Sequence, residues 1–362
     1  MSKVKKIMIF GMPGSGKSTV SAVLDNHSLI YNSPHADKIL PIFYDKSIMK
    51  AVDEMAHKFL SKKLEKNNIL HISNYFGKSK FSINSINFLN LIYSYCDYSR
   101  TESYANCGWG PVPQYSGDQF ALNFNFNFDK YHSLIKERIF SDDVKSPEEV
   151  WDIFYVTFFE VYTNKKFNYE KSISIVAPNS IEGMKFVLDN FKDTKVIFLN
   201  RDFKGLMLTS SLRRMGGWFD NSINTSIEDN IKLLIKCGYA KRLLDDMEEV
   251  NILKNKYKGQ LLTLDLNDLV DKYDDNIISI ANFLDIDIEN SLYYASYFGY
   301  RYNNKNYDPI SKIGDNADEY FDDKIHAILD SFMEKGFQYK KANLYSELRK
   351  NIGYKFLSGI YR

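Results

Sequence analysis

A glycine-rich run with one lysine and three hydroxyl residues begins at position 11, directly after the apolar segment 7–10. The run fits the pattern G-x-x-x-x-G-K-[S/T], in which backbone N–H groups turn inward around a bound phosphate. Its lysine adds positive charge, and the serine that follows can offer a hydroxyl to phosphate or Mg²⁺. The pattern predicts a nucleotide site whose phosphate contacts come from Gly11, Pro13, Gly14, Ser15, Gly16, Lys17, Ser18 and Thr19.

A second group of polar residues follows the apolar run 195–199. Arg201 follows that run after one residue, Asn200, and the helix predicted at 204–213 carries Thr209, Ser210 and Arg213. Ligands of open α/β sheets bind beyond the carboxyl ends of the strands. We therefore expect Arg201 and the hydroxyls two turns later to form a second phosphate site beside the glycine-rich loop.

The elements that must position these residues follow from the alternation of apolar runs with amphipathic segments. Strands are predicted at 6–10, 69–73, 172–176, 195–199 and 260–264, and helices at 19–24, 50–66, 146–164, 180–191, 204–213, 227–249 and 274–284. Strands that alternate with helices are typical of parallel sheets with crossover helices. The predicted fold class is α/β: a P-loop nucleotide-binding fold with a central, mostly parallel sheet flanked by helices, and a helical C-terminal part.

One irregular stretch interrupts this alternation between about residues 75 and 143. It is rich in Asn, Ser and aromatic residues, and Trp109 within it could stack on a sugar ring. Long irregular stretches in compact domains tend to be functional, so we interpret 75–143 as a substrate-binding insertion, with a plain surface excursion as the alternative. No repeat or linker divides the chain, which predicts one domain over 1–362.

Composition narrows the range of functions and compartments. The 362 residues carry a net charge of +1, which gives no overall field for nucleic acid or an anionic membrane. No apolar run approaches the roughly 20 residues needed to cross a bilayer. The three cysteines lack metal-ligand spacing, which favours a reducing, cytoplasmic location over a disulfide framework. We expect no metal site formed by the protein alone, and the sequence does not predict an oligomeric state.

Several segments resemble the PAPS-dependent sulfotransferases, most nearly the tyrosylprotein and carbohydrate branches. The glycine-rich loop resembles the family's donor-side loop, and residues 177–179 resemble its threonine-proline-asparagine signature. Residues 264–270 with 278–284 and residues 348–354 resemble later segments of the family in the same order. The resemblance covers both ends and the middle of the chain and leaves 75–143 unmatched.

This resemblance implies transfer of a sulfuryl group from PAPS to an acceptor hydroxyl of a small molecule or carbohydrate, with a phenol as another possible acceptor. It implies that Arg201 holds the 3′-phosphate with Thr209 or Ser210 and that Arg213 matches a further arginine of those branches. Tyrosylprotein sulfotransferases have their catalytic carboxylate at a certain spacing after the glycine-rich loop. At that spacing this chain has His35, with Asp37 close by, and a histidine suits the role of general base at neutral pH. Lys312 falls where the family's donor-covering loop lies, although a solvated lysine is the alternative there, and His27 is interpreted as structural.

Two departures from the family leave other functions open. Gly14 stands where the family has Arg or Lys, and Lys17 stands where it has Thr; Lys17 could supply the missing charge from its own position. Because Lys17 is also what an ATP-using loop has, a kinase that transfers the γ-phosphate of ATP with Mg²⁺ is the alternative. A non-catalytic nucleotide-binding protein is a third hypothesis. We expect catalytic roles for His35, Lys17 and Asp37.

Overall fold

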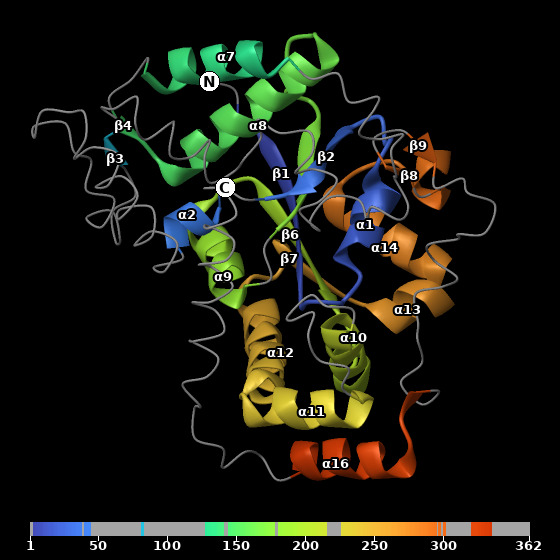
Figure 1. Cartoon of the computed structure of the whole chain (residues 1–362). Coiled ribbons are helices and arrows are strands. Elements are labelled where there is room, and N and C mark those ends of the chain that lie inside the picture. Colours follow the sequence, from blue (N-terminus) through green and yellow to red (C-terminus); the bar gives the residue numbers. More distant parts are fainter. Residues whose placement is uncertain are drawn as a thin grey trace, which may run out of the picture.

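A computed structural model describes residues 3–37, 40–44, 81–82, 127–140, 144–177, 180–215, 226–294, 296–297, 300–301 and 320–334. Five parallel strands form a sheet in the spatial order β2–β5–β1–β6–β7 (Figure 1). The strands are β1 (Lys5–Gly11), β2 (Ile30–Ala36), β5 (Ser172–Val176), β6 (Thr194–Asn200) and β7 (Leu261–Asp265). Because all five run in the same direction, their carboxyl ends lie along one edge. The predicted α/β class and parallel sheet are confirmed, and the strand predicted at 69–73 lies outside the described residues.

Helices cover both faces of this sheet. One face packs against α1 (Lys17–Leu24), α13 (Leu266–Asp271), α14 (Tyr273–Leu284) and the short 3₁₀ helix η3 (Asn290–Tyr293). The other packs against α8 (Pro147–Thr163), α9 (Ile181–Asn190), α10 (Phe203–Met215) and α12 (Tyr239–Lys256). Figure 1 shows these two helical layers on opposite sides of the strands.

Burial on both faces explains why the central strand is apolar from Ile7 to Phe10. In β1, Met8 and Phe10 contribute to the core on one face of the sheet, and Ile7 and Ile9 contribute to the core on the other. A strand covered by helices on both sides has no solvent-facing positions to fill with polar residues. The strand order places β1 in the middle of the sheet, so the glycine-rich loop lies at the middle of its carboxyl edge.

The predicted start of α8 is confirmed. Ser146 is its N-cap: the Ser146 hydroxyl accepts from the Glu149 amide at 3.1 Å, and the Glu149 carboxylate accepts from the Ser146 amide at 2.6 Å. This capping box satisfies two backbone donors that the helix itself leaves unpaired. The signal for α8 is local, which is why the sequence alone locates it.

The irregular structure predicted for 75–143 is wrong for its last part, because residues 128–140 form the helix α7 (Phe128–Phe140). The Asn127 side chain accepts from the Lys130 amide at the start of α7. Tyr131 and Ile135, one turn apart, are buried, and the Tyr131 hydroxyl donates to the Phe154 carbonyl of α8. Packing against α8 stabilises this helix, and most of the remaining insertion lies outside the described residues.

The helix predicted at 227–249 is in fact two helices, α11 (Ile227–Lys236) and α12. The chain turns at Cys237 and Gly238, and Gly238 has a φ of 79°, which a glycine adopts without strain. Further along, α16 (Asp323–Glu334) packs on α10 through stacked Phe203 and Phe332 rings. The remaining short elements are α2 (Pro41–Tyr44), β3 (Phe81–Ser82), β4 (Val144–Lys145), β8 (Ser296–Tyr297) and β9 (Tyr300–Arg301).

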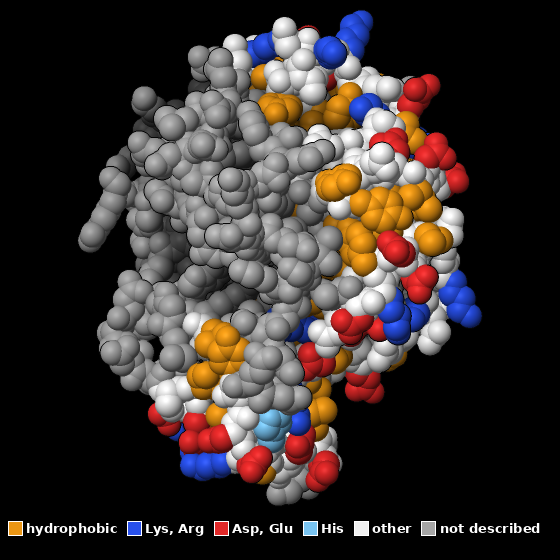
Figure 2. Space-filling model, turned by 90° about the vertical axis from the view of Figure 1, so that its right-hand side faces the viewer, with side chains coloured by type: hydrophobic (Ala, Val, Ile, Leu, Met, Phe, Trp, Pro, Cys, Tyr) orange, Lys and Arg blue, Asp and Glu red, His pale blue; other side chains and the backbone are white. Residues whose placement is uncertain are grey.

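The described surface carries charges of both signs. Figure 2 shows acidic and basic side chains interspersed on one face, together with exposed hydrophobic side chains. The large exposed hydrophobic residues include Ile278 of α14 and Ile288, Tyr293 and Tyr294 near it. Within the described ranges, no helix has both the length and the apolar character needed to cross a bilayer.

Candidate phosphate-binding site

The glycine-rich loop joins the carboxyl end of β1 to the start of α1, as predicted. Gly16 is the N-cap of α1, and the Thr19 amide donates to the Gly16 carbonyl at 2.8 Å. Ser146, Ser180 and Ser226 cap α8, α9 and α11 with their hydroxyls, but no side chain caps α1 and no acidic residue lies in its first turn. An uncapped helix start after a glycine loop is suited to bind an anion.

Lys17 places its ammonium group against this loop. Its Nζ donates to the carbonyl oxygens of Gly11 at 2.9 Å and Met12 at 3.2 Å. Both carbonyls belong to residues where β1 passes into the loop, so the positive charge lies beside the backbone that would surround a phosphate. Ser18, the next residue, is exposed, and its hydroxyl is accessible from solvent.

Arg201 connects the loop to α10. Its Nη1 donates to the Gly14 carbonyl at 3.2 Å and to the Thr209 Oγ1 at 2.7 Å. Gly14 is distant from Arg201 in sequence, whereas Thr209 follows Arg201 by about two helical turns. The Thr209 hydroxyl in turn donates to the Gly205 carbonyl at 3.0 Å. We call Arg201, Gly14 and Thr209 the arginine clamp. The sequence-based expectation that Arg201 and Thr209 lie beside the loop agrees with this geometry.

The structure separates Thr209 from its neighbour Ser210. The Ser210 hydroxyl is hydrogen-bonded to the Tyr239 hydroxyl of α12 at 3.0 Å, whereas Thr209 contacts Arg201. Consecutive helical residues point about 100° apart, so both cannot face the clamp. Arg213 lies in α10, but its side chain is outside the described residues, as is all of Lys312.

Gly14 has little room for a side chain. Its φ is 86°, and a Cβ at this position would lie 2.5 Å from the Thr209 Cγ2. The Thr209 methyl therefore fills the space that a side chain at position 14 would need. In this chain a cation at position 14 is incompatible with the clamp, and the lysine of the loop is the remaining source of positive charge in the loop itself.

Asp37 is an anchor between β2 and α8. Its carboxyl group accepts from the Trp151 Nε1 at 2.6 Å, from the Tyr155 hydroxyl at 3.1 Å and from the Leu40 amide at 3.0 Å. Asp37 is also 3% exposed. A buried carboxyl group with three donors is well satisfied, and this geometry favours a positioning role over direct proton transfer. Its catalytic role stays a prediction.

The two histidines lie near opposite ends of β2: His27 precedes its start at Ile30, on the edge of the sheet away from the glycine-rich loop. His35 lies in β2 near its carboxyl end, where Ala36 pairs with Val176 of β5, and its side chain is not among the described ones. His27 is buried: its Nδ1 accepts from the Leu29 amide, and its Nε2 contacts the Asp287 carbonyl at 2.9 Å. These two contacts define the Nε2–H tautomer and support the structural interpretation of His27.

Carboxylates for a magnesium ion are not at the expected place. In P-loop enzymes that use MgATP, an acidic residue helps the loop hydroxyl to hold Mg²⁺. The two strands beside β1 are β5, which ends at Val176 and is followed by Ala177, and β6, which ends at Asn200 and is followed by Arg201. Asp202 follows, and its Oδ1 accepts from the Gly205 amide at the start of α10. Among the described residues, no group of three or more His, Cys, Asp and Glu is arranged to bind a metal.

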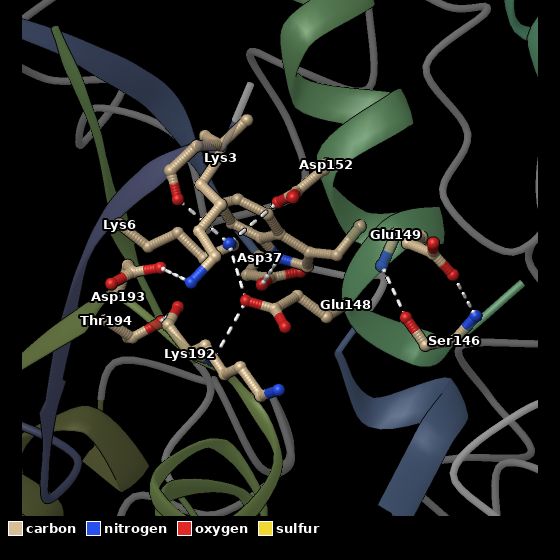
Figure 3. A network of polar contacts seen from close by, with 12 residues as sticks. Lys3, Lys6, Asp37, Ser146, Glu148, Glu149, Asp152, Lys192, Asp193 and Thr194 are labelled. Atoms are coloured by element: carbon tan, nitrogen blue, oxygen red, sulfur yellow. Dashed lines mark hydrogen bonds and ion pairs between the residues drawn. The ribbon is translucent and has the colours of Figure 1, made fainter. Parts of the chain in front are cut away.

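A buried ionic cluster that the sequence analysis missed lies where β1 packs against α8. The Lys6 Nζ is 2.8 Å from the Glu148 Oε1 and 3.1 Å from the Asp152 Oδ1, and Figure 3 shows its ammonium between these carboxyl groups. Burial raises the pKa of Asp152 to about 7, although the nearby Lys6 lowers it. The sequence does carry signals for this cluster: a lysine within an apolar strand, and two acidic residues one helical turn apart at 148 and 152.

One further described carboxyl group has a raised pKa. Burial raises the pKa of Asp246 in α12 to about 6, against the attraction of Arg242. Asp246 and Asp152 both lie outside the clamp and the loop. Neither raised pKa therefore concerns a group of the clamp or the loop.

Comparison with known proteins found neither a matching family model nor a matching curated sequence. Solved structures to which the chain is similar include a sulfotransferase domain from the curacin biosynthetic pathway, with 12% identity, coverage of 98% of this chain and 99% of that chain, and a TM-score of 0.43. A sulfotransferase STF9 from Mycobacterium avium has 12% identity, coverage of 93% and 78%, and a TM-score of 0.40. Retinol dehydratase in complex with androsterone and inactive cofactor PAP has 10% identity, coverage of 94% and 83%, and a TM-score of 0.39. At these identities and TM-scores the likeness says nothing about the chemistry of this chain.

Proposed function

We propose that this protein is a sulfotransferase that moves a sulfuryl group from PAPS to a hydroxyl of a small-molecule or carbohydrate acceptor. The observation that carries the proposal is the arginine clamp, which brings a guanidinium and a hydroxyl against the phosphate loop. A donor with phosphates at both the 5′ and the 3′ position needs two adjacent anion sites. The loop with Lys17 and the pair Arg201–Thr209 supply them.

The residues present fit this donor better than they fit MgATP. The glycine loop, the uncapped start of α1 and Lys17 suit the 5′-phosphosulfate, and the Arg201 guanidinium, held in place by Thr209, suits the 3′-phosphate. Sulfuryl transfer from PAPS needs no metal bound by the protein. The non-acidic ends of the two strands beside β1 agree with that requirement.

The roles of individual side chains follow from their charges and positions. When bound, PAPS supplies an activated sulfuryl group for in-line transfer. Lys17 would stabilise the negative charge that develops where the bond to the donor breaks. His35, at the carboxyl end of β2, would accept the proton of the acceptor hydroxyl. Asp37 would hold that end of β2 against α8 through Trp151 and Tyr155.

The test is calorimetric titration of the full chain with PAP, ADP and ATP, each with and without Mg²⁺. We expect PAP to bind without metal and more tightly than ADP or ATP. Arg201→Ala should weaken PAP binding by about tenfold or more, because a hydrogen bond to a charged group contributes roughly 1.5–3 kcal/mol. Binding of AMP, which lacks the 3′-phosphate, should change little. The matched control is Arg242→Ala, which removes an arginine paired with Asp246 on α12.

A kinase is the second candidate, because Gly16, Lys17 and Ser18 complete the loop pattern of ATP-using enzymes. It predicts ATP binding that depends on Mg²⁺ and indifference to PAP. That result would refute the sulfotransferase proposal. Tight PAP binding without turnover of any hydroxyl acceptor would instead favour a non-catalytic nucleotide-binding protein.

A further inference from the structure

Gly205 occupies the first turn of α10, a position where glycine is unfavourable. Apart from proline, glycine is the residue least favourable to a helix interior, and alanine is the most favourable. Gly205 is buried, and its neighbours on either side are Lys204 and Leu206 of the same helix. The glycine at this position must therefore be explained by the atoms that surround it in the folded protein.

The space beside Gly205 is filled by the side chain of Arg201. A Cβ at position 205 would lie 2.6 Å from the Arg201 Nε, 3.3 Å from the Arg201 Cδ and 2.7 Å from the Asp202 Oδ2. The Arg201 side chain thus lies flat along the first turn of α10. From there its Nη1 reaches the Gly14 carbonyl and the Thr209 hydroxyl.

Gly205 also contacts the other groups at this turn through its backbone. Its amide donates to the Asp202 Oδ1 at 2.7 Å, and its carbonyl accepts from the Thr209 hydroxyl at 3.0 Å. The second bond uses the Thr209 proton, so the Thr209 oxygen presents a lone pair to Arg201. Two features of one residue, its carbonyl and its missing side chain, therefore contribute to the position of the guanidinium.

We propose that Gly205 is a positioning residue for Arg201: its lack of a side chain allows the guanidinium to join the phosphate loop to Thr209. Gly205 acts through Arg201 and contributes no atom to the ligand. That the ligand is a nucleotide with a 3′-phosphate rests on the proposed function; the dependence of Arg201 on Gly205 does not.

Substitution at this position separates ligand binding from stability. The atoms that an alanine Cβ would meet belong to the flexible ends of Arg201 and Asp202 and not to backbone. These side chains can move aside while α10 keeps its shape, and alanine favours the helix. Gly205→Ala should therefore fold with a thermal midpoint at or above that of the wild type and lose the clamp.

The experiment measures dissociation constants of the full chain for PAP, AMP and pyrophosphate by calorimetry, together with thermal unfolding. We expect Gly205→Ala to weaken the binding of PAP by about tenfold or more, as Arg201→Ala does, and to change the dissociation constant of AMP by less than about threefold. In the Arg201→Ala background, Gly205→Ala should produce no further change, since a residue acting through Arg201 has nothing left to position.

Gly183→Ala is the matched control. Gly183 also lies in the first turn of a helix, and a Cβ there would meet the Tyr44 ring at 2.6 Å, but this position is in α9 and away from Arg201. The control should leave the ratio of PAP to AMP affinity unchanged.

The outcomes separate this inference from the proposed function. Wild-type protein that binds PAP no more tightly than AMP would refute the function. The inference would still be supported if Gly205→Ala reproduced the effects of Arg201→Ala on all three probes. It is overturned if Gly205→Ala keeps wild-type affinities, if its effect persists in the Arg201→Ala background, or if Arg201→Ala itself alters the binding of no probe.

Discussion

Asp152→Asn should make the protein more stable at alkaline pH, although it removes one partner of a buried lysine. The Asp152 carboxyl group lies 3.1 Å from the Lys6 Nζ, and Glu148 lies on the other side of that ammonium at 2.8 Å (Figure 3). Burial raises the pKa of Asp152 from 3.8 to about 7, and the attraction of Lys6 only partly opposes this rise. The ionised form of Asp152 is therefore disfavoured in the folded protein.

The sign and size of the effect follow from proton linkage. When the pKa of an acid is higher in the folded than in the unfolded state, the folded state binds more protons at any pH between these two pKa values. The free energy of unfolding therefore falls as pH rises from about 4 to about 7. A rise of roughly three units corresponds to about 4 kcal/mol of lost stability above pH 7. Asn does not titrate, so the variant should match the wild type near pH 4 and exceed it by up to this amount at pH 8.

The assay is urea unfolding of the wild type and Asp152→Asn at pH values from 4 to 8. The control is Glu248→Gln, which neutralises an exposed carboxylate of α12 and should leave the pH dependence unchanged. Parallel stability curves for Asp152→Asn and the wild type would refute the reasoning. A variant less stable than the wild type at pH 8 would mean that the attraction of Lys6 outweighs burial.

Three other changes test the site. Asp37→Asn should lower the free energy of unfolding by about 1–3 kcal/mol in urea titrations, because the carboxyl group satisfies three buried or partly buried donors; unchanged stability would contradict the anchoring role. Thr209→Ser should keep PAP affinity within about threefold, whereas Thr209→Val should reduce it about tenfold in calorimetry, because only Val removes the hydroxyl that Arg201 contacts. Equal affinities would show that the hydroxyl is dispensable. His35→Ala should abolish turnover while PAP binding stays intact, and full activity of this variant would exclude His35 as the base.

Much of the fold was predictable because its signals are local. Apolar runs located β5 and β6, and Ser146 with Glu149 located the start of α8 from four consecutive residues. The helix α7 was missed because its signal is spread over space: Tyr131 and Ile135 become a buried face only when α8 lies against them. The break at Gly238 was missed although glycine itself was the available signal.

For the candidate site, the sequence predicted which strand ends meet but not how side chains share the space between them. Arg201 was expected beside the loop because ligands of open α/β sheets bind beyond the carboxyl ends of the strands. The structure pairs β6 with β1 and gives a distance of 3.2 Å from Arg201 to the Gly14 carbonyl. The choice between Thr209 and Ser210 depends on the rotation of α10 about its axis, which Tyr239 on another helix reveals. The role of Gly205 was not visible either, because spacing along the chain does not show that Arg201 folds back over its own helix.

Gly14 shows why a comparison of positions one at a time can mislead. In the sequence it is a missing cation, and this absence kept a non-catalytic protein among the hypotheses. In the structure the Thr209 methyl fills the place of a side chain at position 14, and the carbonyl of Gly14 accepts from Arg201. The two positions are therefore one packing arrangement, and a change at either alters the other. With position 14 committed to the clamp, Lys17 is the loop cation on which catalysis would depend, so the glycine alone is no evidence against activity.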